Sequence, residues 1–305
     1  MPIRIPDHLP AFSVLQEENV FAMTNFRALH QDIRPLRVLI LNLMPTKIVT
    51  EIQLLRLLSN TPLQIDIDLL KTNSYSSRNT SAEHLESFYK TFDEIKNNRY
   101  DGMIVTGAPV ENMDFDEVLY WNELLEILDY AKENVHSSVF ICWGAQAALK
   151  YYYNISKYPL DHKLSGVFPH TVTNKKHPLV RGFDDIFYVP HSRYTMTRLS
   201  DIENCPDLDV IATSEQAGLY LCASKDMRKI FITGHSEYDS DTLATEYFRD
   251  LDKNLKIDMP YNYFPDNDPT KTPPASWTSH ANLLFSNWLN YCIYQTVSYD
   301  FVSPK

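Results

Sequence analysis

Residues 137–149 read SSVFICWGAQAAL, and this stretch decides the fold. Residues 139–141 are β-branched and aromatic, which predicts a buried strand. Residues 145–153 are rich in alanine and leucine, which predicts a helix. Cys142 then lies at the turn between them, where the helix N-terminus favours the thiolate form of a cysteine. This is the arrangement of a nucleophile elbow, although a small buried apolar residue at a strand end would give the same pattern.

The composition points to a folded protein without a targeting segment. The chain has 305 residues, of which 44% are hydrophobic and 22% charged, as in a domain with a sizeable core. Residues 1–10 contain three prolines and no apolar core of a signal peptide. No stretch approaches the ~20 apolar residues of a membrane span. We therefore expect a cytoplasmic protein that does not bind membranes.

The net charge of −11 argues against a nucleic-acid partner. An anionic ligand would need cations gathered locally against this background. The cations to consider are Lys47, Lys163, Arg193 and Arg249.

Strand and helix patterns alternate along the chain. Buried strands are predicted at 36–43, 102–106, 139–141 and 229–233, and the alternating run at 64–70 predicts a strand covered on one side. Helices are predicted at 51–58, 81–97, 116–135, 145–153 and 241–254. This alternation predicts an α/β fold with a doubly wound, mostly parallel sheet. Shorter, antiparallel strands are expected at 166–172, 185–189 and 210–213, and a last helix at 279–296. We expect an N-terminal arm at 1–35, one α/β domain at 36–296 with a β-rich insertion at 160–213, and a tail at 297–305.

Ligands of such sheets bind at the carboxyl ends of the strands. The loops 44–47, 107–111 and 142–146 are predicted there, and His235 follows the strand at 229–233. A reactive thiol needs a base, and the base needs an acceptor on its other ring nitrogen, which Glu237 can provide. A His-x-Glu pair alone is equally consistent with a solvated turn. Together with the elbow it predicts Cys142 as nucleophile, His235 as general base and Glu237 as its partner.

The other cysteines and the histidines show no pattern of their own. Cys142, Cys205, Cys222 and Cys292 match neither a disulfide framework nor a zinc pattern. Cys222 and Cys292 are predicted in the core and Cys205 in a loop. The ten histidines show no ligand spacing, so we expect no metal site and no cofactor.

Several motifs resemble the homoserine O-acyltransferase family of methionine biosynthesis. They are CWGAQ at 142–146, GHSEY at 234–238, MPIRIP at 1–6, HQDIRPL at 30–36, NLMP at 42–45, TGAPVE at 106–111, PHSRY at 190–194 and the segment 280–291. The resemblance runs from the first residues to the last helix. It implies a fold similar to the class I glutamine amidotransferase domain.

The resemblance also implies roles for individual residues. An acyl group passes from coenzyme A to Cys142 and then to the hydroxyl of L-homoserine, so acyl-CoA is a co-substrate rather than a cofactor. Arg249 would bind the amino-acid carboxylate, helped by Ser192 and Lys163, unless it forms only a surface ion pair with Glu246. Lys47 resembles the family lysine close to the thioester. The alternative is that Lys47 is a solvent-exposed lysine at the start of a helix with no role in the site.

Elbow geometry places the oxyanion donors among the backbone amides near Trp143. The oligomeric state stays open, because the aromatic C-terminal helix fits either the core or the interface of a homodimer.

Two positions depart from related patterns. Ser236 stands where this family usually has proline, so we expect a slightly looser turn around Glu237. Phe140 stands where amidotransferases generally have glycine, which argues against that activity.

Glu111 is expected to select the acyl group. The resemblance associates glycine at this position with succinyl transfer and glutamate with acetyl transfer. Repulsion between Glu111 and a succinyl carboxylate would be about 4 kcal/mol at ~4 Å and an effective dielectric constant of ~20. The sequence therefore predicts a homoserine O-acetyltransferase that uses acetyl-CoA.

The alternatives are a homoserine O-succinyltransferase, a serine O-acyltransferase, an amidotransferase-like cysteine hydrolase and a binding protein without activity. Homoserine and serine differ by one methylene, which a pocket distinguishes by only ~1–3 kcal/mol.

Overall fold

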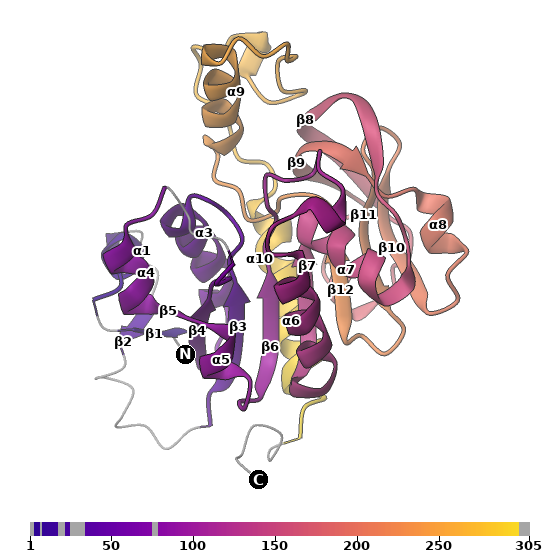
Figure 1. The fold of residues 1–305 in the computed structure, drawn as a ribbon. Helices are drawn as coiled ribbons and strands as arrows, with labels where there is room; N and C mark the ends of the chain where they lie inside the picture. The colour runs from indigo at the N-terminus through magenta and orange to yellow at the C-terminus, as the bar shows by residue number, and fades with distance from the viewer. Residues whose placement is uncertain (1–2, 7, 18–21, 25–33, 75–78, 299–305) are drawn as a thin grey trace.

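The computed structural model describes residues 3–6, 8–17, 22–24, 34–74 and 79–298 (Figure 1). Residues 30–33 of the HQDIRPL motif, the start of MPIRIP and the end of the expected tail lie outside these ranges. The bounds expected for the arm, the insertion and the tail remain predictions.

One mixed sheet crosses the described part of the chain. Its order is β2-β1-β4-β3-β6-β7-β12-β11-β10-β8-β9, and β5 pairs with β4. The parallel strands are β1 (Ile3–Ile5), β2 (Ala22–Thr24), β3 (Leu36–Leu41), β4 (Ile65–Leu70), β5 (Tyr89–Lys90), β6 (Tyr100–Val105), β7 (Val135–Ile141) and β12 (Lys229–Ile232). The antiparallel strands are β8 (Tyr158–Val172), β9 (Ile186–Met196), β10 (Leu208–Ser214) and β11 (Gly218–Ser224). The expected fold class is confirmed.

Helices cover both faces of the parallel strands. Val139 and Ile141 of β7 belong to one hydrophobic cluster, and Phe140 between them belongs to the other. The first face carries α1 (Ala11–Glu17), α3 (Lys47–Ser59) and α10 (Thr278–Asn287), and the second carries α6 (Trp121–Asn134) and α7 (Trp143–Tyr153). Burial on both faces explains why β3, β6 and β7 are nearly continuously buried, whereas β4 nearer the edge alternates.

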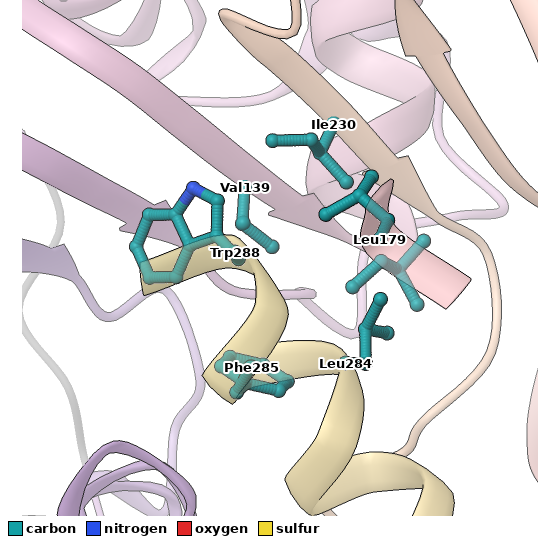
Figure 2. Close-up of a pocket in the computed structure, with 7 residues that line it drawn as sticks. Val139, Leu179, Ile230, Leu284, Phe285 and Trp288 are labelled. Carbon is teal, nitrogen blue, oxygen red and sulfur yellow. The ribbon is translucent and has the colours of Figure 1, made fainter. Parts of the chain in front are cut away.

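The C-terminal segment closes the first face. Figure 2 shows Val139 and Ile230 of the sheet beside Leu284, Phe285 and Trp288 of α10 and of the following π-helix η4 (Trp288–Tyr294). The indole nitrogen of Trp288 also donates a hydrogen bond to Oγ of Ser137 at 3.0 Å. This end of the chain is therefore core, whatever the oligomeric state.

The helix expected at 81–97 is wrong in part. It is divided into α4 (Ala82–Phe88), β5 and α5 (Phe92–Ile95). Tyr89 adopts an extended backbone, pairs with Leu69 of β4 and donates from its hydroxyl to Oε1 of Glu51 at 2.6 Å. A buried acceptor from a distant helix thus overrides the local helix propensity.

The other boundaries shift less. The helix expected at 116–135 begins only at Trp121, after the short 3-10 turn η1 (Phe115–Glu117) and an extended Val118. It ends at Asn134, because Val135 already pairs in β7. The remaining helices are α8 (Leu199–Glu203), η2 (Pro178–Val180), η3 (Pro265–Asn267) and α9 (Thr242–Asp252), of which α9 stands apart from the helices that cover the sheet (Figure 1). None of the described helices is long and apolar enough to cross a membrane.

Candidate active site

Cys142 occupies the turn between β7 and α7, as its flanking residues predict. Its backbone has φ 50° and ψ −114°, a region that non-glycine residues rarely adopt. Its amide donates to the carbonyl of Ile232 at 2.7 Å, and its side chain is buried. Two residues on, a Cβ on Gly144 would lie 2.6 Å from the carbonyl oxygen of Thr106, so only glycine fits there. The strained turn is therefore fixed by the strands on both sides.

His235 lies beside Cys142 because β12 and β7 are neighbours. The two strands are parallel and in register, with Ile232 opposite Ile141. Nδ1 of His235 is 2.6 Å from Oε1 of Glu237. With Nδ1 taken by Glu237, Nε2 is the ring nitrogen left to face Cys142, which is one of the groups that raise the pKa of His235. The three predicted residues of the triad are thus brought together.

The electrostatics of the triad favour a charged imidazole. Burial by itself would lower the pKa of His235, but the charges and hydrogen bonds of Cys142 and Glu237 outweigh it and raise the pKa well above its usual value. An imidazolium beside the thiol favours a thiolate–imidazolium pair. In contrast, burial raises the pKa of Cys292 to about 12 and also raises the pKa of Cys222, so these two stay thiols. All four cysteines are free.

The loop after β6 closes over the pair. A Cβ on Gly107 would lie 3.3 Å from Cβ of Cys142 and 3.6 Å from Cε1 of His235. Four residues later, Oε1 of Glu111 accepts a hydrogen bond from the amide of Tyr194 at 3.3 Å. Burial raises the pKa of Glu111, while the charge of His235 opposes this shift. Glu111 therefore lies within electrostatic range of His235, on the edge where it was expected.

Lys47 is buried rather than solvated. Its Nζ donates to the carbonyl of Asn42 at 2.5 Å and lies 5.4 Å from the centre of the Tyr89 ring. Burial lowers the pKa of Lys47 to about 8, although the Glu51 carboxylate opposes this effect. These contacts hold the Lys47 amine against the carboxyl end of β3. Neither contact involves Cys142. Its closeness to a thioester remains a prediction.

The three residues expected to bind substrate meet two carboxylates of α9. Lys163 from β8 lies 2.8 Å from Asp250 and 3.6 Å from Glu246. Ser192 from β9 donates to Oε2 of Glu246. Arg249 pairs with its neighbour Asp250 at 2.7 Å, not with Glu246, and 52% of its side chain is exposed.

Two residues near the triad were missed as site residues by the sequence reasoning. The ring of Tyr238 stacks on His235 with centroids 4.2 Å apart, and its hydroxyl donates to Oε1 of Glu246 at 2.8 Å. Tyr238 belongs to the GHSEY motif, which is a signal that pointed to it. Glu246 was considered only as an ion-pair partner of Arg249. It instead joins the catalytic base, through Tyr238, to Ser192.

The Trp143 side chain packs away from the reacting group. Its ring lies about equally near Phe115 and Tyr120, at 6.0 Å between centroids in each case, and is fully buried. Any contribution of Trp143 to the site would therefore come from its backbone amide at the start of α7.

In the part of the chain that the structure describes, no group of three His, Cys, Asp or Glu side chains is placed to hold a metal ion.

Comparisons with known proteins identify the family of the chain. The family model described as homoserine O-succinyltransferase matches residues 2–299. A homoserine O-acetyltransferase of Acetivibrio thermocellus is 58% identical over 300 residues, which cover 98% of each chain. One of Brevibacillus brevis is 55% identical over the whole of both chains. Among solved structures, a glutamine amidotransferase of Thermotoga maritima matches with a TM-score of 0.56 at 13% identity, covering 85% of this chain and 99% of that one, which shows the fold alone.

Proposed function

The chain belongs to the homoserine O-acyltransferase family and acts as a homoserine O-acetyltransferase in methionine biosynthesis, and we propose that it carries the acetyl group as a thioester on Cys142. The observation that carries this proposal is the position of His235, which bridges the Cys142 thiol and the Glu237 carboxylate. A thiolate–imidazolium pair supplies both the nucleophile and the proton that acyl transfer needs.

In the first half of the reaction, Sγ of Cys142 attacks the carbonyl carbon of acetyl-CoA. The resulting tetrahedral oxyanion faces the backbone amides at the start of α7. It collapses by breaking the bond to the sulfur of coenzyme A, and this sulfur takes the proton from Nε2 of His235. The products are free CoA, an acetyl thioester and a neutral imidazole.

In the second half, the neutral His235 accepts the proton of the homoserine hydroxyl. The hydroxyl oxygen attacks the thioester carbon, and Cys142 leaves as the thiolate. O-acetyl-L-homoserine departs, and the thiolate–imidazolium pair is restored. Glu237 holds the imidazole in the orientation that both proton transfers require.

The charges on α9 suit a zwitterionic amino acid. The guanidinium of Arg249 can bind the carboxylate of homoserine through two parallel hydrogen bonds. Lys163 and Ser192 would contribute further contacts to the same carboxylate. The Glu246 carboxylate, already bonded to Ser192 and Tyr238, is the complementary group for the ammonium. The acceptor hydroxyl would then extend towards His235, on which Tyr238 stacks.

The decisive experiment is intact mass spectrometry before homoserine is added. Acetyl-CoA should add one acetyl group to the wild type, and homoserine should then remove it. Cys142→Ala should show no adduct, whereas Cys205→Ala, which removes a half-buried thiol elsewhere, should still be labelled. An unchanged adduct in Cys142→Ala would refute the proposed mechanism. Serine in place of homoserine tests the choice of acceptor in the same assay.

A further inference from the structure

The turn that carries His235 and Glu237 is held on several sides. The amide of His235 donates to the carbonyl of Pro190 at 2.8 Å, and the amide of Thr233 donates to the carbonyl of Tyr220 at 2.9 Å. At Gly234 the backbone approaches β9 so closely that a Cβ would lie 2.7 Å from Cγ1 of Val189. The residue before the catalytic base is therefore fixed from β9 and β11 together.

Ser236, between the base and its partner, has a contact of its own. Its Oγ lies 2.6 Å from the hydroxyl of Tyr220 on β11, and both residues are buried. Proline, which the family resemblance associates with this position, would restrict the backbone through its ring and could form no such bond. The sequence alone suggested a looser turn, but the structure offers a side-chain hydrogen bond where the ring is missing.

The Tyr220 hydroxyl is itself well placed. The ring contacts Phe187 edge-on at 5.6 Å and His170 at 5.0 Å. Burial raises the pKa of Tyr220, and the Glu237 charge adds to this, so the group remains a neutral phenol. The bond to Ser236 is thus made between two neutral hydroxyls in a buried, rigid setting.

We propose that Tyr220 and Ser236 are positioning residues: the bond between their hydroxyls holds the turn so that Glu237 stays on Nδ1 of His235. This inference rests on the proposed function, because the orientation of His235 matters only if His235 is the base. A misplacement of well under 1 Å at such a base is enough to slow proton transfer measurably.

The test is a double-mutant cycle on the acetylation rate of Cys142. Tyr220→Phe removes only the phenol oxygen and should slow acetylation about tenfold when residue 236 is serine. In a Ser236→Pro background the same change should have almost no effect, because the ring has taken over. The Michaelis constant for homoserine should stay unchanged throughout, since neither residue touches the substrate site.

A second pair keeps the test valid if the proline variant does not fold. Ser236→Ala should slow acetylation as much as Tyr220→Phe, and the double variant Tyr220→Phe/Ser236→Ala should be no slower than either single change. Ser236→Thr, which keeps a hydroxyl, should recover most of the rate. Tyr130→Phe is the matched control, because the Tyr130 hydroxyl donates to the carbonyl of Asn98 at 2.7 Å, just before the amino end of β6 and so at the opposite edge of the sheet from Cys142.

The pH profile separates positioning from a general loss of stability. The two other histidines next to the turn stay neutral, because burial lowers the pKa of His170 to about 4 and that of His191 well below its usual value. These two histidines therefore do not contribute to the profile, and Lys47 and Glu111, which can, are unchanged between the variants compared. The alkaline limb should move to lower pH in Tyr220→Phe, because His235 loses part of its hold on Glu237. A wild-type rate and profile in a folded Tyr220→Phe, or equal losses in the serine and proline backgrounds, would overturn the proposal. Absence of any acetyl adduct in the wild type would instead refute the proposed function.

Discussion

The two halves of the site are built in different ways. Cys142 and His235 stand on neighbouring parallel strands, are nearly inaccessible to solvent and are fixed by backbone register and direct side-chain bonds. Lys163, Ser192 and Arg249 come from two antiparallel strands and from α9, and are held by ion pairs and hydrogen bonds to carboxylates. The triad is buried and preorganised, whereas the substrate half combines the half-exposed Arg249 with Lys163 and Ser192, whose side chains are buried against carboxylates. Chemistry at a fixed centre needs the first arrangement, and exchange of a small polar substrate needs the second.

The comparison predicts that changes in the triad reduce the chemical step most. Cys142→Ala should lower kcat by about 10⁴-fold or more, because no other group can form the thioester. Steady-state assays and the mass of the acetylated enzyme measure this directly. The thermal unfolding temperature serves as the control and should change little. Turnover within about tenfold of the wild type would show that the thioester is not on the main path.

Loss of the orienting carboxylate should have the next largest effect. Glu237→Gln should lower kcat by about 10²–10⁴-fold, because the imidazole loses the partner on Nδ1. Glu237 is one of the groups that raise the pKa of His235, so in the variant the imidazolium should lose its proton at a lower pH. With a weaker cation beside it, Cys142 should be alkylated more slowly by iodoacetamide across the pH range tested. An alkylation profile identical to that of the wild type would mean that Glu237 does not control the pair.

In the substrate half, we expect substitutions to weaken the binding of homoserine without changing the rate at which Cys142 is acetylated. Arg249→Gln should raise the Michaelis constant for homoserine by about 10–100-fold, the value of a lost charged, bidentate contact. Acetylation of Cys142 in the absence of homoserine should proceed at the wild-type rate. Arg249→Lys keeps the charge but not the forked geometry and should give an intermediate constant. If both variants slow acetylation itself, the two halves are not separable.

The sequence predicted the triad better than the substrate half, for a physical reason. Cys142 and His235 each follow a continuous apolar run, and parallel strands buried on both faces bring their carboxyl ends to one edge. Their meeting therefore follows from local patterns. The contact between Ser192 and Glu246 joins residues that are 54 positions apart on elements with no shared pattern, so only the family resemblance pointed to Ser192.

Similar long-range choices explain the errors in the fold. The strand β5 interrupts a segment whose composition favours a helix, because Tyr89 reaches the buried Glu51 of α3. The surface pair of Arg249 with Glu246, given as the alternative role of Arg249, does not form either: Arg249 contacts Asp250, and Glu246 is engaged by Ser192 and Tyr238. Competition for a buried acceptor is decided by tertiary packing and leaves no trace in a local pattern.

The smallest effect is expected at Glu111, which lies between the two halves and should affect the choice of acyl donor more than the rate. Glu111→Gly should raise the ratio of succinyl-CoA to acetyl-CoA use by about tenfold or more, since even a screened remnant of the charge repulsion exceeds about 1.4 kcal/mol. Glu111→Gln separates charge from size: it removes the charge but keeps the volume, so a smaller rise there than in Glu111→Gly measures the steric share. The readout is the competition between the two thioesters for Cys142. If the ratio of succinyl-CoA to acetyl-CoA use is unchanged in both variants, a residue other than Glu111 determines the choice of acyl donor.

The pH dependence of this ratio isolates the charge. Burial raises the pKa of Glu111, so this carboxylate takes up a proton at a higher pH than an ordinary glutamate does. The repulsion should therefore weaken as the pH is lowered. In the wild type the preference for acetyl-CoA should fall at a pH where carboxylates with ordinary pKa values are still ionised. In Glu111→Gln the ratio should change only through protonation of the succinyl carboxylate itself, which serves as the internal reference. If the wild type and Glu111→Gln show the same pH dependence, the selection is steric, and Glu111 acts through its volume alone.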